Sequence, residues 1–284
     1  MAYICYHAAC PDGFGAAWAV KRGIETPCQT DTYIPCFYGQ PMPAIPDGQD
    51  VVIVDFSFDE EAIRSLCRRS KTVTLLDHHR SAEIDLQGLL TRPEANLHVT
   101  FDMNHSGAYL AWEHFHEGSD MPTLINYLED RDLWRKSLPY HEEVTAFIQS
   151  YERTFENLDM LARAIPDSNL LGDYSDVVVE GGAILRFKTQ KVNEICENRT
   201  RQSIGGYANI PVVNSSAFMS EVADRLLELC PDAPFAGYWF ARGDGQRQWG
   251  LRSRQGSDMD VSEVAKKFGG GGHKNAAGFS ISSN

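Results

Sequence analysis

Residues Thr72-Val73-Thr74-Leu75-Leu76-Asp77-His78-His79 indicate the fold class, because they join a strand-forming run to a carboxylate and two imidazoles. Short β-branched, apolar runs are typical of buried strands in an α/β sheet, and ligands bind beyond the carboxyl ends of such strands. Carboxylate oxygen and neutral imidazole nitrogen are ligands that Mn²⁺, Fe²⁺ and Zn²⁺ share. Taken alone, the stretch fits a metal site and a solvated polar loop equally well.

The first strand of the chain is also predicted to end in side chains of this kind. Residues 2–7 predict a strand that finishes at His7, and Ala16 to Arg22 predicts a helix. Cys10 and Asp12 lie between the two. We therefore expect them on a strand-to-helix turn close to His7.

A further buried strand is predicted at Val51–Val54 and ends at Asp55, and Ser57 and Glu60 have the spacing of a capping box for the helix that follows. The alternation of strands and helices predicts a mostly parallel sheet, whose strands end on one edge. A lone Asp after a strand is usually a helix cap or turn former. Three strand ends with acids or imidazoles on one edge instead predict a shared site.

Length, charge and cysteine usage limit the class of protein. The 284 residues suffice for about two domains with a substantial core. No apolar run approaches the ~18 residues of a membrane span, the first residues lack signal-peptide features, and seven scattered cysteines fit a reducing compartment. We therefore expect a cytoplasmic protein without membrane contact. The net charge of −13 argues against a broad coat on long nucleic acid.

The sequence pattern divides the chain into three predicted parts. Residues 1–135 are predicted to form a mostly parallel α/β domain, residues 136–204 a helical connector, and residues 205–284 a smaller α+β domain. Residues 242–284 hold seven basic and four acidic side chains. This local excess predicts a small anion-binding region, with a chance fluctuation in surface charge as the alternative.

A glycine run near the C-terminus suits phosphate recognition. Glycines let backbone N–H groups approach an anion closely, and a following His and Lys add donors and charge. A flexible turn is the alternative that glycines alone leave open, but nearby guanidinium groups favour phosphate binding. The predicted substrate-binding residues are Gly270, Gly271, Gly272, His273, Lys274, Arg252 and Arg254.

The order of these motifs resembles that of the DHH phosphoesterases. The motif residues, in chain order, are His7 with Asp12, then Asp55, then Asp77-His78-His79, then Asp130. The tail at residues 268–279, with residues 251–254 upstream, is similar to the DHHA1 substrate domain found in relatives. The resemblance covers roughly residues 1–135 and 205–284.

The resemblance implies a pair of Mn²⁺ ions, or other divalent ions such as Mg²⁺, and hydrolysis of a phosphoester whose nucleotide end the second domain holds. The implied ligands are His7 for the first ion, Asp12, His78 and Asp130 for the second, and Asp55 as the bridge. His79 is then expected to orient ligands or meet the phosphate, and Asp77 to fix the imidazoles. Ions ~3.5–4 Å apart lower the pKa of a bridging water and neutralise charge on the phosphorane oxygens.

The first motif departs from the family, which usually has two aspartates there, because Cys10 stands where the earlier aspartate is expected. Three roles for Cys10 are open. It is a thiolate ligand, or the first ion is held weakly and arrives with substrate, or Cys10 is a small packing residue.

The fourth motif is also ambiguous. Asp130 follows an apolar run as the family's fourth acid does, which favours it as the ligand. Asp132 is expected to pair with a nearby arginine on a helix surface.

The predicted function is metal-dependent hydrolysis of phosphodiester bonds in short single-stranded oligonucleotides or dinucleotides. The net charge favours such short substrates over long DNA. The alternatives are a phosphomonoesterase acting on small nucleotides such as pAp, a cyclic-dinucleotide phosphodiesterase, and a non-catalytic nucleotide sensor. Whether the chain forms a homodimer is left open.

Overall fold

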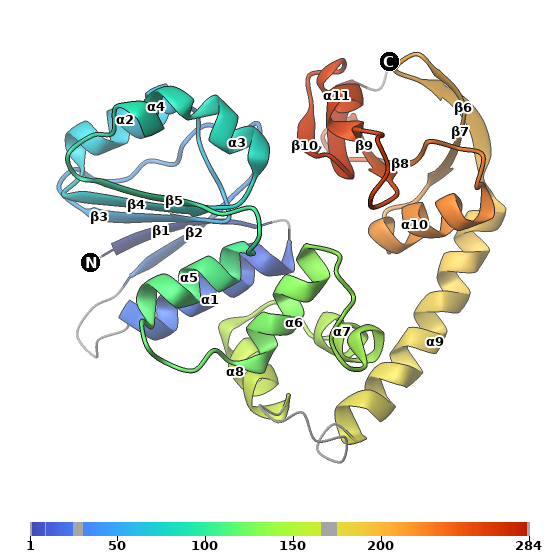
Figure 1. Ribbon diagram of the computed structural model, residues 1–284, viewed down its shortest axis with the longest axis horizontal. Helices are drawn as coiled ribbons and strands as arrows, with labels where there is room; N and C mark the ends of the chain where they lie inside the picture. The colour runs from blue at the N-terminus through green and yellow to red at the C-terminus, as the bar shows by residue number, and fades with distance from the viewer. Residues whose placement is uncertain (1, 9, 25–30, 166–174, 283–284) are drawn as a thin grey trace. The chain divides into compact units, whose positions relative to one another are not determined.

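The computed structural model describes residues 2–8, 10–24, 31–165 and 175–282, so part of the predicted helical connector, at 166–174, lies outside the described residues. The chain divides into two compact units, Met1–Ile184 and Leu185–Asn284. Each unit has its own sheet and its own apolar cores (Figure 1). The predicted domain boundaries at residues 135 and 204 stay predictions.

The first unit is built on a five-stranded sheet with the order β2-β1-β3-β4-β5. Its strands are β1 (Ala2–His7), β2 (Thr32–Cys36), β3 (Asp50–Val54), β4 (Thr72–Asp77) and β5 (Leu97–Phe101). Every neighbouring pair is parallel, which confirms the predicted sheet. The helices are α1 (Pro11–Ile24), α2 (Glu60–Arg69), α3 (Arg80–Asp85), α4 (Gln87–Thr91), α5 (Gly107–Phe115), α6 (Thr123–Asp132), α7 (His141–Ser150), α8 (Phe155–Ala164) and the start of α9 (Ser175–Glu197).

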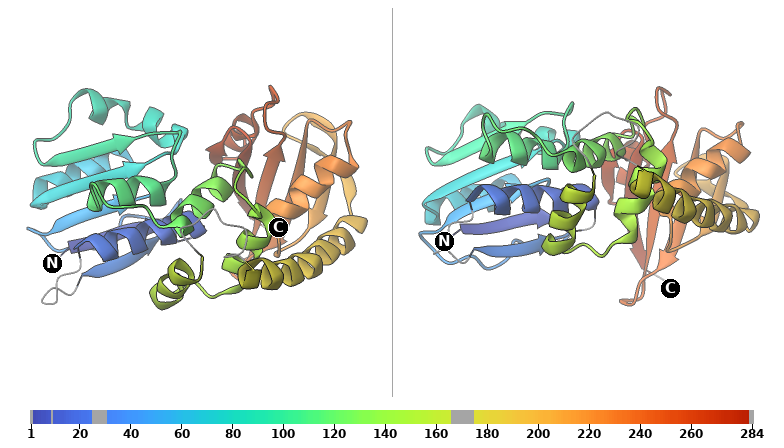
Figure 2. Two further views of the ribbon diagram at one scale, coloured as in Figure 1. Left: turned by 60° about the horizontal axis from the view of Figure 1, so that its bottom comes forward. Right: turned by 90° about the horizontal axis from the view of Figure 1, so that it is seen from below.

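Helices cover both faces of this sheet, as a parallel sheet requires. Successive side chains of β3 alternate between the two faces. Val52 and Val54 join the core that includes Trp18 of α1, whereas Val51 and Ile53 join the core on the other face. Figures 1 and 2 show α1 and α5 side by side on one face, and Figure 1 shows α2 to α4 on the opposite face.

The strand order reverses between β1 and β3, since the chain passes from β1 to β2 on one side and then to β3 on the other. Ligands of open α/β sheets bind at such a switch point, in the crevice beyond the carboxyl ends of the strands. His7 ends β1, Asp55 follows β3, and Asp77 ends β4. The fold therefore gathers the predicted residues at the expected edge.

The second unit contains a six-stranded sheet with the order β10-β11-β9-β8-β7-β6, antiparallel except for the β7–β8 pair. Its strands are β6 (Thr200–Ile204), β7 (Tyr207–Asn214), β8 (Phe235–Ala241), β9 (Gln246–Ser253), β10 (Gly271–His273) and β11 (Ala276–Ser282). Helices α10 (Met219–Leu229) and α11 (Val261–Lys266) belong to separate cores on its two faces. The predicted α+β class is confirmed.

One boundary differs from the sequence prediction. The sequence predicts a helical pattern to about Arg201, but α9 ends at Glu197 and β6 begins at Thr200. The side chains of β6 are exposed except for Ile204, so the strand carries little apolar pattern of its own. It forms by pairing with β7. Among the helices of the described residues, none is both long and apolar enough to cross a bilayer.

Candidate functional site

Asp55 is the central residue of a polar cluster at the carboxyl ends of β1, β3 and β4. Its backbone N–H donates to the carbonyl of Leu76 at 2.9 Å, which continues the pairing of β3 with β4. Its φ is +52°, in the left-handed region that few residues other than glycine adopt, although Asp tolerates it better than most. The side chain is 1% exposed. Strained backbone of this kind persists where the surrounding structure fixes it, often at functional sites.

One carboxylate oxygen of Asp55 lies in a group that we call the cysteine triad, made of His7, Cys10 and Asp55. Asp55 Oδ2 is 3.1 Å from Cys10 Sγ and 3.3 Å from His7 Nδ1. The sulfur and that nitrogen are themselves 3.3 Å apart. Three atoms able to bind a metal therefore converge on one point.

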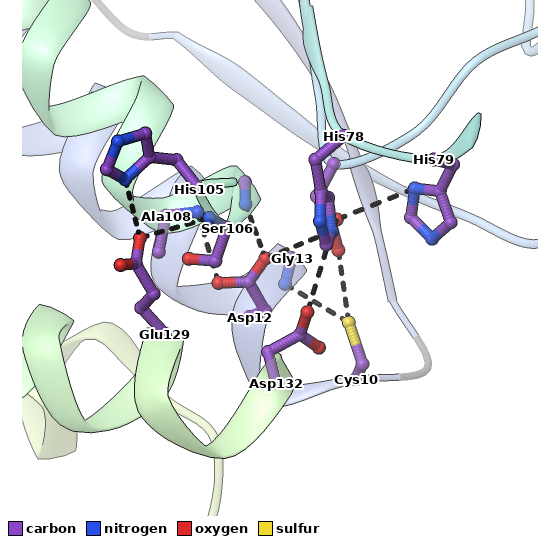
Figure 3. Close-up of polar contacts among 12 residues, drawn as sticks. Cys10, Asp12, Gly13, His78, His79, His105, Ser106, Ala108, Glu129 and Asp132 are labelled. Carbon is purple, nitrogen blue, oxygen red and sulfur yellow. Dashed lines mark hydrogen bonds and ion pairs between the residues drawn. The ribbon is translucent and has the colours of Figure 1, made fainter. Parts of the chain in front are cut away.

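The other oxygen of Asp55 lies in a second group, the aspartate group, made of Asp12, Asp55, His78 and Asp132. His78 Nε2 is 3.0 Å from Asp55 Oδ1, 3.8 Å from Asp12 Oδ2 and 3.6 Å from Asp132 Oδ2. Figure 3 shows Asp12 and Asp132 on the same side of His78, with Cys10 close by. Asp55 thus belongs to two adjacent groups of potential ligands and offers one oxygen to each.

Asp12 is held by the start of α5. Its carboxylate accepts hydrogen bonds from the backbone N–H groups of Gly107 at 2.6 Å and Ala108 at 3.1 Å. Burial, together with the negative charges of Asp55 and Asp132, raises the pKa of Asp12 well above its usual range. A cation placed among these carboxylates would relieve their repulsion.

Asp77 orients the two histidines that follow it. It is fully buried, and its Oδ1 accepts from the backbone N–H of His78 at 2.7 Å and from that of His79 at 3.2 Å. The same oxygen lies 2.6 Å from His79 Nδ1. Ser57 Oγ donates to Asp77 Oδ2 at 2.6 Å. The carboxylate of Asp77 is therefore placed to fix the ring of His79 and the backbone of His78, whereas the family resemblance implies that it fixes both imidazoles.

The bond made by Ser57 corrects an expectation. Ser57 does not cap α2, because Asp59 is the N-cap residue and accepts from the N–H of Ala62 at 2.8 Å. Serine and aspartate are both good caps, so the sequence alone did not separate them. The position of Ser57 beside Asp77 depends on the pairing of β3 with β4.

The structure places Asp132, rather than the predicted Asp130, at the cluster. Both residues lie in the last turn of α6, and residues two apart on a helix point in different directions. The carboxylate of Asp130 accepts from the N–H of Ser137 at 3.0 Å and from its hydroxyl at 2.6 Å, and it pairs with His141. Asp130 therefore anchors the chain after α6 and is not directed at His78.

Opposing effects set the protonation of the central groups. Burial alone would raise the pKa of Asp55, but its bonds with His7 and His78 outweigh burial and hold the pKa below the usual range. Burial disfavours the charged form of His78, yet Asp55 raises the pKa of His78 to about 10. Burial acts likewise on His79, and Asp77 raises its pKa to about 8. Without a metal, the imidazoles supply the positive charge that the carboxylates need.

Tyr38 borders the cluster and was not among the predicted site residues. Its ring centroid lies 5.3 Å from that of His7, 5.8 Å from that of His79 and 4.6 Å from that of Phe56. Tyr38 is 53% exposed, so it presents an aromatic surface beside this cluster. Tyr38 follows β2 in a loop, and nothing in the local sequence indicates this neighbourhood.

Gly107 permits the close approach of α5 to Asp55. A Cβ atom at Gly107 would lie 2.4 Å from Asp55 Cβ and 2.9 Å from Asp55 Cγ. We expect Gly107→Ala to displace Asp55 and to lower the affinity for Mn²⁺ by about 10-fold or more, because ligand geometry controls affinity. Isothermal titration calorimetry would measure this loss of Mn²⁺ affinity.

Gly118→Ala is not a suitable control, because Gly118 has a positive φ. Ala111→Gly in α5 is the control for a general loss of helix stability. Equal losses of Mn²⁺ affinity in Gly107→Ala and Ala111→Gly would contradict the steric explanation.

The C-terminal glycine run forms an edge strand rather than an open loop. Gly271 to His273 make β10, which pairs with β11. A Cβ atom at Gly270 would lie 2.1 Å from the carbonyl oxygen of Gly278, and one at Gly272 would lie 2.6 Å from that of Ala276. Lys274 follows in the exposed turn between the strands. The glycines therefore allow two backbones to pack tightly.

The strand register places Arg252 and His273 on one face of the second sheet. Arg252 is opposite Ala276, and Ala276 is opposite His273. A parallel row two residues away consists of Gly250, Gly278 and Gly271. Residues aligned in this way share a face. The ring of Tyr238 covers Gly250, since its Cζ would lie 2.1 Å from a Cβ atom there, whereas a Cβ atom at Gly271 would meet nothing within 4 Å. Gly271 is therefore the open position beside one guanidinium and one imidazole.

Arg254 has a structural role in place of the predicted phosphate contact. Its guanidinium donates to the carbonyl oxygens of Ala233 and Leu227, each at 2.7 Å, and of Cys230 at 3.2 Å. These bonds satisfy the C-terminal end of α10 and the turn after it. Arg252 is the arginine of this pair that remains a candidate for binding substrate.

A scan of family models matches the DHHA1 domain at residues 213–284. An uncharacterized protein of Acanthamoeba polyphaga mimivirus is 27% identical over 299 residues, covering 98% of this chain and 67% of that protein. Oligoribonuclease NrnB of Bacillus subtilis is 28% identical over 101 residues, which cover 34% of this chain and 24% of that enzyme.

Solved structures share the fold. The structure of a DHH domain from a protein described as a member of a family of ribosomal proteins gives a TM-score of 0.53 at 14% identity, covering 98% of this chain and 82% of that one. The pGpG-specific phosphodiesterase PggH of Vibrio cholerae gives a TM-score of 0.50 at 14% identity, covering 99% and 94% of the two chains.

The fold and the site define a two-unit α/β protein with clustered aspartate, histidine and cysteine side chains at the switch point of a parallel sheet. The matches confirm the resemblance drawn from the motifs. The DHHA1 family model matches residues 213–284, and the chain shares its fold with a solved DHH domain.

Proposed function

We propose that the chain is a hydrolase, a metal-dependent phosphodiesterase that acts on short oligonucleotides or dinucleotides. One observation carries the proposal: Asp55 offers one oxygen to the cysteine triad and the other to the aspartate group. A carboxylate shared in this way suits a pair of divalent ions. The carboxylates and imidazoles of the two groups fit Mn²⁺ or a similar divalent ion.

Divalent ions bound there would supply a water of lowered pKa and would neutralise the charge that develops on the phosphate. The protein supplies the framework. Asp55 bridges the two groups, while Asp12 and Asp132 add negative charge on the His78 side. Asp77 holds the ring of His79 through Nδ1, which fixes the direction in which the ring can meet a phosphate.

Several features support the proposal that the substrate is short. The net charge of −13 opposes a long polyanion. Arg252 and His273 share a face of the DHHA1 sheet beside Gly271, where no neighbouring atom would lie within 4 Å of a Cβ atom, so a phosphate or nucleotide can approach the backbone. Two similar proteins are named for short nucleotide substrates, an oligoribonuclease and a pGpG-specific phosphodiesterase.

A panel of substrates tests this function. We expect the Mn²⁺-loaded chain to release mononucleotides from linear dinucleotides and RNA of a few nucleotides, and to lose that activity when a chelator removes the metal. The panel also contains pAp, a cyclic dinucleotide and a long single strand, with products separated by chromatography. Free phosphate from pAp alone would show a phosphomonoesterase, and cleavage of the cyclic substrate alone would show a cyclic-dinucleotide phosphodiesterase. Tight nucleotide binding without turnover would show a sensor.

A further inference from the structure

We propose that Cys10 is a metal ligand, so that the cysteine triad is a mixed sulfur, nitrogen and oxygen site selective for a zinc-class cation. The aspartate group beside it, which has only carboxylate and imidazole donors, then takes Mn²⁺ or Mg²⁺. This inference deepens the proposed function, on which it rests for the presence of divalent ions. It names the class of ion that each group takes.

The spacing of the cysteine triad fits one ion. Bonds of about 2.3 Å to sulfur and about 2.0–2.1 Å to nitrogen or oxygen place tetrahedral ligands about 3.3–3.6 Å from one another. The three separations among His7 Nδ1, Cys10 Sγ and Asp55 Oδ2 are 3.3, 3.1 and 3.3 Å. The two distances to the sulfur are slightly short for this geometry, so a small outward shift of Cys10 suffices to seat a metal.

The local backbone also favours a sulfur in this position. Cys10 precedes α1 as its N-cap, since its carbonyl accepts from the N–H of Phe14 and its Sγ accepts from the N–H of Gly13 at 3.2 Å. The helix N-terminus and the backbone donor favour a thiolate, but burial and the charges of Asp55, Asp132 and Asp12 raise the pKa of the Cys10 thiol well above its usual range. The thiol would therefore release its proton when a cation binds beside it. Serine, threonine, aspartate and asparagine are the preferred caps, so capping alone does not explain a cysteine here.

Packing alone does not explain Cys10 either. The other cysteines of the described residues are buried, namely Cys5, Cys36, Cys67, Cys196 and Cys230. Cys10 is half-buried, and its sulfur faces His7 and Asp55 instead of an apolar core. A side chain aimed at two potential ligands, at the switch point of the sheet, has the surroundings of a metal donor.

The choice of cation follows from the donors. Thiolate ligands select zinc and other softer ions, whereas carboxylate and water suit Mg²⁺ and Mn²⁺. An aspartate at position 10 would make the two groups chemically alike. The cysteine makes them different, so the two ions need not be the same element.

X-ray absorption at the zinc edge tests the assignment on the full chain, reloaded with one equivalent of Zn²⁺ after chelation. We expect a sulfur shell at about 2.3 Å in the unmodified protein and none in Cys10→Ser. Zinc affinity should fall at least about 100-fold in Cys10→Ser, since losing even an outer-shell partner costs about 10–100-fold. In Cys10→Asp, the ratio of Zn²⁺ to Mn²⁺ affinity should fall at least about 10-fold.

Two controls keep the result interpretable. Cys67→Ala removes a buried cysteine of α2 and should retain the sulfur shell. Serine is a good N-cap, so Cys10→Ser should fold, and retained Mn²⁺ binding at the aspartate group, followed by electron paramagnetic resonance, verifies this.

A zinc shell of nitrogen and oxygen alone in the unmodified protein would overturn the assignment, as would a sulfur shell that persists in Cys10→Ser. Neither outcome depends on turnover. A chain that shows the Cys10-dependent shell but hydrolyses no substrate of the panel would support this assignment while contradicting the proposed function.

Discussion

Asp55→Asn is expected to lower kcat/KM for a dinucleotide by about 10³-fold or more, which corresponds to about 4 kcal/mol of transition-state stabilisation. The variant replaces one carboxylate oxygen with an amide nitrogen that cannot ligate a metal, and it removes the shared negative charge. Because Asp55 takes part in both the cysteine triad and the aspartate group, neither group keeps its full set of donors. Metal content per chain, measured by mass spectrometry after dialysis, should fall in parallel.

The fold should survive this substitution. Asparagine, like aspartate, tolerates the left-handed backbone that Asp55 adopts at φ +52°. Asp47→Asn is the matched control, because the Asp47 side chain is 80% exposed, and its activity should stay within about twofold of the unmodified chain. Near-normal turnover and metal content in Asp55→Asn would contradict the proposal that both groups need Asp55 to bind metal.

Asp132→Asn is expected to lower kcat/KM by about 100-fold, or about 3 kcal/mol. Asp132 Oδ2 lies 3.6 Å from His78 Nε2, so its charge acts on the aspartate group directly. Mn²⁺ affinity should fall with the activity, because carboxylate donors suit Mn²⁺. Titration calorimetry with Mn²⁺, alongside steady-state kinetics, measures both effects.

Asp130→Asn is the paired control, since Asp130 lies two residues away in the same helix. Asp130 accepts hydrogen bonds from Ser137 and pairs with His141, so its loss should cost about 1–3 kcal/mol of unfolding free energy. The metal affinity should stay within about 10-fold of the unmodified chain. The reverse pattern, with metal lost in Asp130→Asn and kept in Asp132→Asn, would return the ligand role to Asp130.

The strands that carry the site could be predicted because their signals are local. Val51–Val54 and Thr72–Leu76 are short buried runs, and each is followed by a polar residue that the fold places at the sheet edge. Because strands and helices alternate along the chain, the strands are predicted to be parallel and to end on one edge of the sheet. This prediction needs no knowledge of long-range contacts. For this reason, the sequence could place Asp55 and His78 at the same site.

The features that the sequence did not reveal depend on contacts between distant segments. Asp130 and Asp132 have the same chemistry, and only the direction of the last turn of α6 separates them. Arg254 has the chemistry of a phosphate ligand, but the carbonyl oxygens at the end of α10 occupy its guanidinium. Tyr38 reaches the site from a loop. Local pattern gives the residue type in each case, whereas tertiary packing decides what the side chain contacts.

Anomalous diffraction from a crystal of the chain loaded with Mn²⁺ and Zn²⁺ would show whether Asp55 is shared by two metal ions. We expect two metal peaks about 3.5–4 Å apart, one on each side of the Asp55 carboxylate. His7 and Cys10 should contact the zinc peak, and Asp12, His78 and Asp132 the manganese peak. A single peak that does not contact Asp55, or no peak at saturating metal, would show that Asp55 does not bridge two metal ions.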